Sequence, residues 1–259
     1  MTEGFLGGTH EFIILLVFFA LMLLSVEAGF RLGRKFETNT SAETKAQIAI
    51  VEAGLLGVLA LLLGFTMSMA VSRFESRKQL VLNEANAIST SYLRARLLPA
   101  PEGPEIESLL RQYINVRVRY GTSGDGLTLL NDLHKQSMHL QTELWTRAAV
   151  YAQKDPDPVK AGLLLQSLNE VFDLETARWT AFQNQVPPNV MYVNAIVALL
   201  AATLVGYAFG VYGRRDPLSM LVLVFAITLV YSVIVDLDRP RTGFIRANQQ
   251  PMIDLLHQP

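Results

Sequence analysis

The residues whose spacing best suits a chemical task lie on one long apolar segment. An α-helix would place Leu61, Phe65, either Ser68 or Met69, and Ser72 on one face, because they follow one another at intervals of three or four residues. That face is bulky and apolar at first and carries hydroxyl groups toward its end. Such a face suits an ion pore, because an apolar constriction can close by excluding water. We take Leu61 and Phe65 as a candidate constriction, and Thr66, Ser68 and Ser72 as candidate polar lining.

Small residues form a second face on the same segment. Ala53, Gly57, Ala60 and Gly64 also recur at intervals of four, three and four residues. In lipid, such small-residue faces let helix backbones approach closely. The pattern therefore predicts helix packing, either within one subunit or between copies of the chain, and leaves both open.

Two acids flank the linker between the first two apolar segments. Ionisable groups near a bilayer core are costly and by default indicate function, and a ring of acids at a pore mouth would favour cations. Glu27 and Glu52 are therefore candidate mouth residues. The alternative is an interfacial ion pair between Glu27 and Arg31, four residues apart, which the position of both acids near helix ends favours.

Other kinds of chemistry find little support in the chain. It has 259 residues, no Cys and a formal net charge of −1, which excludes thiolate metal sites and gives no electrostatic basis for binding nucleic acid. Zinc-protease, P-loop and nucleophile-elbow motifs are missing. His134 and His139 lie five residues apart, a poor spacing for one helix face. We expect no enzymatic activity, no metal site and no cofactor.

The elements that would position these residues are membrane-spanning helices. Hydrophobic residues make up 51% of the chain and charged residues only 17%, against roughly 25% charged in soluble domains. A membrane helix needs about 20 predominantly apolar residues. Four stretches are nearly free of charge, at 12–26, 48–72, 180–213 and 217–235. They predict four spans arranged as two hairpins.

The charges gather between the hairpins. Residues 73–185 hold 13 Lys or Arg and 13 Asp or Glu, so the near-zero net charge is an average over two unlike parts. We expect four regions: a first hairpin over 1–72, a polar domain over 73–185, a second hairpin over 186–236 and a tail over 237–259.

Helices are also predicted for the polar domain, which makes the fold class all-α. Strand alternation and hairpin turns are missing. No Gly or Pro interrupts 72–98, so the second span is expected to continue as one helix beyond the bilayer. Further helices are expected over 105–120, over 127–152 and from Pro158 to the Pro187-Pro188 pair. An even number of spans puts both termini and the polar domain on one side, but basic residues at both membrane faces leave the orientation open.

The residues around the exit of the second span carry a family resemblance. The segment LGFTMSMAVSRFESRK at 63–78, followed by NEANAI at 83–88, resembles the neck helix and charged cluster of bestrophins. With DLDRPRTGFI at 236–245 and Gln250-Pro251, most of the chain is similar to a bacterial bestrophin-like family of unknown function, the DUF4239 group.

The resemblance implies a pentameric ion channel whose second span lines a central pore. It also implies a cytosolic helical domain and cytosolic termini, in a protein that crosses the bacterial inner membrane several times. Phe65 and Leu61 match the last and middle bulky positions of the bestrophin neck, whereas the first position falls on Gly57. The acidic calcium clasp of animal members is missing, since Asp236 and Asp238 are the only acids near that place.

Two hypotheses follow. The first is a homo-oligomeric ion channel whose partners are identical subunits, the lipid bilayer and inorganic ions, with the ion's charge and the gating stimulus left open. The second is a membrane-anchored interaction or sensory protein that does not conduct. Burial of Phe65 inside a single subunit would favour the second.

Overall fold

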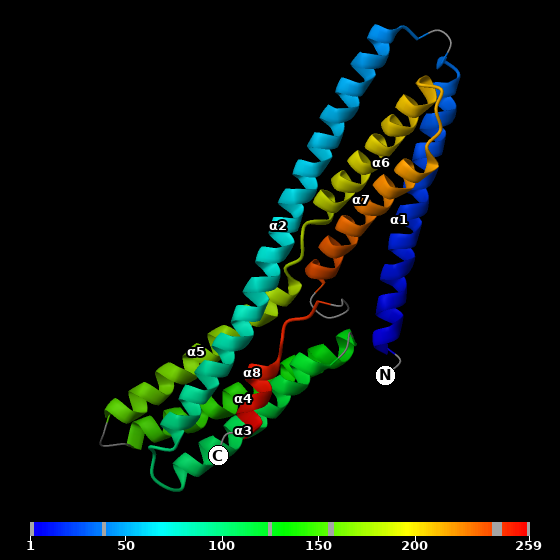
Figure 1. The fold of residues 1–259 in the computed structure, drawn as a ribbon. Helices are drawn as coiled ribbons and strands as arrows, with labels where there is room; N and C mark the ends of the chain where they lie inside the picture. Colours follow the sequence, from blue (N-terminus) through cyan, green and yellow to red (C-terminus); the bar gives the residue numbers. More distant parts are fainter. Residues whose placement is uncertain (1–2, 38–39, 124–125, 155–157, 240–244, 258–259) are drawn as a thin grey trace. The chain divides into compact units, whose positions relative to one another are not determined.

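The computed structural model describes residues 3–37, 40–123, 126–154, 158–239 and 245–257 (Figure 1). Within these ranges 88% of the residues are helical, and no strand occurs. The predicted all-α class is confirmed. Asp157 precedes Pro158 and is of a residue type that favours a helix N-cap, but it lies outside the described residues.

Four helices carry the apolar stretches: α1 (Glu3–Arg34), α2 (Ala42–Ala95), α6 (Pro188–Val211) and α7 (Pro217–Asp238). The described chain contains four segments long and apolar enough to cross a membrane, as predicted. Two of the helices begin with Pro, where a missing N–H costs nothing because the first helical turn has no partner for it. Asp216 caps α7, and its side chain accepts a hydrogen bond from the Ser219 N–H at 3.3 Å.

The chain divides into two compact units. The membrane unit comprises the described residues of Phe5–Ser72 and Gln185–Arg239. The helical unit comprises those of Arg73–Asn184 together with Glu3, Gly4 and the C-terminal segment, residues 245–257. Helix α2 contributes to both units because it runs unbroken for 54 residues. The expectation of one helix extending beyond the second span is confirmed.

The helical unit packs α3 (Glu102–Thr122), α4 (Leu127–Lys154) and α5 (Pro158–Gln183) against the second half of α2. Helix α3 begins three residues earlier than expected, because Pro104 fits within its first turn. The short C-terminal α8 (Gln250–Asp254) is followed by a 3₁₀ turn over Leu255–His257. Its Met252 is fully buried in the same core as Tyr113 and Leu168, which fixes the C-terminal segment to the unit.

Glycines bring α1 and α6 together in the membrane unit. A methyl group added at Gly29 would lie 1.9 Å from the Thr203 carbonyl oxygen, and one at Gly206 would lie 2.0 Å from the Val26 carbonyl oxygen. Only glycine permits this backbone approach. The close packing of α1 and α6 therefore depends on glycines, Gly29 and Gly206, that were not predicted from the sequence.

Candidate functional site

Helix α2 has two contrasting faces in the membrane unit. Leu61 and Phe65 are 57% and 64% exposed, and Ser68 and Ser72 on the same face are also exposed. Leu59, Leu63 and Ala70 are buried against the rest of the chain. The face on which sequence spacing placed the constriction is thus the one that the subunit leaves uncovered.

The small-residue face of α2 is open as well. An added methyl at Gly57 or Gly64 would have no atom of the described chain within 4 Å, and Ala53 and Ala60 are exposed. The described part of the subunit therefore leaves this face uncovered. Of the two alternatives for this face, the structure leaves contacts outside the chain, with lipid or with another copy.

Thr66 lies apart from the other candidate lining residues. It is only 2% exposed, its hydroxyl donates to the Leu62 carbonyl at 2.8 Å, and it accepts a hydrogen bond from Asn194 Nδ2 on α6 at 2.7 Å. One step along a helix turns a side chain by about 100°, which takes Thr66 off the face of Phe65. The expectation that Thr66 lines a pore is corrected: it joins two spans of one subunit.

Asn194 on α6 was not among the residues predicted from the sequence. Its side-chain amide is almost completely buried. The signal that could have identified it is a polar amide within an otherwise apolar and uncharged stretch. Amide and hydroxyl pairs join membrane helices because the alternative is a polar group left unsatisfied in hydrocarbon.

The two candidate mouth acids have different surroundings. Arg31 Nε donates to Glu27 Oε1 at 2.7 Å, and Arg215 Nη2 donates to Glu27 Oε2 at 2.7 Å. The Glu27–Arg31 pair, which the sequence favoured, is present, and Arg215 adds a second cation from the turn before α7. Glu52 is half-buried on α2.

A buried charge network ties the helical unit together. Arg117 on α3 donates from Nε and Nη2 to both oxygens of Glu84 on α2, at 2.6 and 3.2 Å, and from Nη1 to Glu175 on α5 at 3.1 Å. Arg178 on α5 also donates to Glu84. Arg117 and Glu84 are fully buried. His134 on α4 closes the network, with its Nδ1 2.9 Å from Glu175.

Glu84 and Arg117 keep their charges despite burial. Burial alone would raise the pKa of the Glu84 carboxyl, but the nearby guanidinium groups of Arg117 and Arg178 outweigh it and hold that pKa below its ordinary value. Burial likewise opposes the charge of Arg117, and Glu84 more than compensates, so the pKa of Arg117 is raised. The opposite charges therefore balance one another inside the core.

Comparison with known proteins agrees with this architecture. The bestrophin-like domain matches residues 17–252 by sequence. None of the curated proteins compared with the chain matches it. Two crystal structures of variants of a bacterial bestrophin homologue from Klebsiella pneumoniae are similar in fold, with TM-scores of 0.64 and 0.67 at 16% and 17% identity.

The similarity extends over nearly the whole of both chains. The first match covers 92% of this chain and 98% of the homologue, and the second covers 93% and 94%. A crystal structure described only as a membrane protein has a TM-score of 0.66 at 17% identity, covering 96% of this chain and 95% of that one. The chain belongs to the bestrophin-like family.

Proposed function

We propose that this chain is the subunit of a bestrophin-like, homo-oligomeric ion channel in which α2 lines the pore. The observation that carries the proposal is the uncovered face of α2. Leu61 and Phe65 present large apolar side chains outward, and Ser68 and Ser72 continue the same exposed face with hydroxyl groups. Repeated around an axis, such helices form an apolar constriction followed by a polar wall.

The small-residue face supports assembly from several copies. Open space beside Gly57 and Gly64 lets a neighbouring helix approach closely. Membership of the bestrophin-like family supports a pentamer in the bacterial inner membrane, with the helical unit and both termini in the cytoplasm. Glu52 on α2 remains the candidate mouth acid, since Glu27 is already held by two arginines.

The alternative is a membrane anchor for a helical interaction or sensory domain, without conduction. Burial of Phe65 within one subunit would have favoured it, and Phe65 is 64% exposed. An exposed apolar side chain can also face lipid, so conduction must be measured.

Ion flux into liposomes reconstituted with the purified protein tests the proposal. We expect flux from the native chain, and faster flux from Phe65→Ala and Leu61→Ala because a wider constriction is easier to wet. Leu24→Ala, at an exposed apolar position on α1, serves as the matched control and should conduct like the native chain. Absence of flux from the native chain and from both constriction variants would leave the anchor as the better explanation.

A further inference from the structure

The hydroxyl-bearing face of α2 continues beyond Ser72 with uncharged polar side chains. At intervals of four, three, four, three and four residues after Ser72 the sequence places hydroxyl or amide groups, at Ser76, Gln79, Asn83, Asn86 and Thr90. All five are exposed or half-buried. Because α2 runs unbroken through this stretch (Figure 1), the spacing keeps them on one face over about 27 Å. In a channel lined by α2, this face extends the wall of the ion path into the helical unit.

A groove between α2 and α5 opens on the same face. It has a volume of about 670 Å³, and Asn83, Asn86 and Thr90 of α2 line it together with Gln166 and Asn169 of α5. Amide and hydroxyl groups present oxygen atoms to a cation and N–H or O–H groups to an anion. These five residues therefore favour neither sign of charge, and the choice falls to the charged residues of the groove.

The charge of the groove comes from two acids on α5. Glu170 and Asp173 are exposed lining residues, and neither forms an ion pair with a residue that the structure describes. The described lining contains no cation. Arg94, four residues after Thr90, lies outside the lining and donates from Nη1 to the Leu163 carbonyl at 2.5 Å. The wall of the groove is therefore negative.

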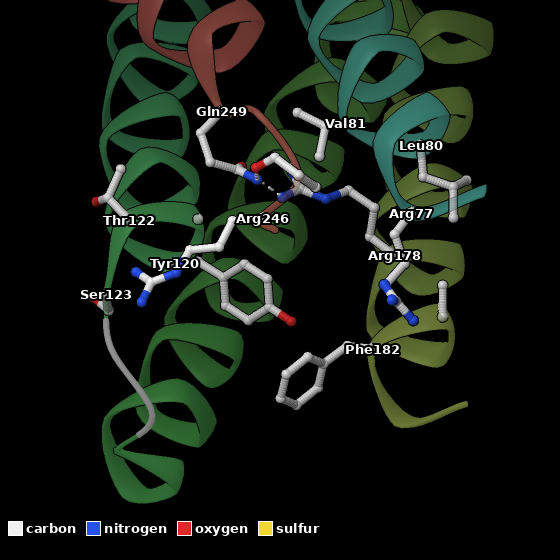
Figure 2. A pocket seen from close by; sticks show the side chains of 13 residues that line it. Arg77, Leu80, Val81, Tyr120, Thr122, Ser123, Arg178, Phe182, Arg246 and Gln249 are labelled. Carbon is white, nitrogen blue, oxygen red and sulfur yellow. Dashed lines mark hydrogen bonds between the residues drawn. The ribbon is translucent and has the colours of Figure 1, made fainter. Parts of the chain in front are cut away.

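Arginines of the helical unit lie on the other side of α2. Figure 2 shows the pocket that Arg77 and Arg178 line there, and nine residues along a helix turn Arg77 by about 180° from Asn86. Both arginines are only 8% exposed. Arg178 donates to Glu84 and to Gln249. These positive charges are thus held in the interior of the unit, and the acids keep the groove side of α2 negative.

We propose that Glu170 and Asp173 make the channel selective for cations. The inference rests on the proposed function, since it assigns the sign of the ion that the channel conducts. Fixed negative charge along an ion path concentrates cations and depletes anions. The amide and hydroxyl oxygens beside the acids replace part of the water around a passing cation, and a wall of this kind is weak enough to release it again.

The ratio of K⁺ to Cl⁻ permeability tests the proposal, measured from the reversal potential of the full chain in planar bilayers under a KCl gradient. We expect a ratio above one for the native chain. The double variant Glu170→Gln/Asp173→Asn should lower it by roughly fivefold, the factor for one unit charge acting over about 4 Å in water. Asp132→Asn is the matched control, because Asp132 is an exposed acid on α4 outside the groove lining, and it should keep the native ratio. Raising KCl to about 1 M should weaken the native preference by screening the exposed acids.

A second measurement examines the groove without requiring conduction. The chain contains no Cys, so Asn86→Cys introduces a single thiol into the groove. In detergent, a cationic methanethiosulfonate should modify this thiol faster than an anionic one of similar size, because the acids attract the first and repel the second. The ratio of the two rates should fall when Glu170→Gln/Asp173→Asn is added and should stay unchanged with Asp132→Asn. Both acids are exposed, so the double variant should fold, which its unfolding temperature checks.

The outcomes separate the ion's charge from the existence of the channel. Conduction that prefers anions overturns the cation inference and leaves the channel in place. A permeability ratio or a rate ratio that the double variant leaves at the native value does the same. Absence of conduction from the native chain overturns the channel, and the inference with it, whatever the thiol rates are.

Discussion

Glu84 illustrates how a single buried carboxylate can hold several elements in place. It is fully buried on α2 and accepts hydrogen bonds from Arg117 on α3 and Arg178 on α5. Separating two such charges from water is costly, and the cost is recovered only while each keeps its partners. The consequence is that loss of the acid should harm the helical unit far more than loss of any exposed ion pair.

Glu84→Gln should therefore destabilise the protein by about 3–5 kcal/mol, the range for removing one partner of a buried ion pair. Thermal or denaturant unfolding in detergent measures the change. Glu75→Gln is the control, because Glu75 and Lys78 form an exposed pair at 3.6 Å, and it should change stability by less than about 1 kcal/mol. Equal effects of the two substitutions would contradict the assigned role of Glu84.

The same carboxylate predicts a pH dependence. Its pKa in the folded state lies below the ordinary value of 4.5 because Arg117 and Arg178 outweigh the effect of burial. The stability that it contributes is then fully present above about pH 4.5 and is lost as pH falls through the folded-state pKa. We expect the stability difference between the native chain and Glu84→Gln to shrink below about pH 4.5. A difference that stays constant down to pH 3 would refute this linkage.

Thr66 and Ser68 are close in sequence but belong to different faces of α2. Thr66→Val removes the acceptor of the Asn194 hydrogen bond and should cost about 1–2 kcal/mol of stability with little change in ion flux. Ser68→Val, on the exposed face, should leave stability nearly unchanged and lower the flux, because an apolar group replaces a hydroxyl. Unfolding and liposome flux, measured on both variants, check the assignment, and a reversed pattern would contradict it.

At the scale of elements, the glycines of the membrane unit separate into two kinds. Gly29→Ala would place a methyl 1.9 Å from the Thr203 backbone oxygen, and a backbone contact cannot relax as a flexible side chain does. We expect a loss of about 1–3 kcal/mol or more from overpacking. Gly54→Ala, with no atom of the described chain within 4 Å, should be neutral or slightly stabilising. Unfolding temperatures in detergent distinguish the two, and equal losses would contradict the α1–α6 packing.

The elements also show what sequence reasoning can reach. The long α2 was predictable because helix continuity is local, and 72–98 contains no Gly or Pro. The exposed face of α2 followed from helical periodicity. The buried network was not predictable, because Arg117 lies 33 residues from Glu84 and 58 from Glu175, and only the packing of three helices brings them together. The prediction for Thr66 was wrong for a similar reason. A hydroxyl group can line a pore or accept a hydrogen bond from Asn194, and only the packing of α2 and α6 distinguishes the two.

For the whole molecule, the proposed channel requires that α2 helices from several subunits surround one axis. The chain contains no Cys, so any thiol cross-link in a single-cysteine variant comes from the introduced residue. In such an assembly Phe65 would lie at the constriction, close to its counterparts in the other subunits. In a monomer or in an anchor held by its other helices, Phe65 would face lipid.

Phe65→Cys should therefore form covalent dimers and higher species when the protein in membranes is treated with a short bifunctional thiol reagent. Leu24→Cys is the matched control, an apolar position on α1 with the same 64% exposure as Phe65, and it should stay largely monomeric because α1 is not expected at the axis. Mass measurement of the unmodified protein in detergent gives the number of subunits. Cross-linking at Leu24 but not at Phe65 would show that the subunits meet through another helix and would remove α2 from the proposed pore.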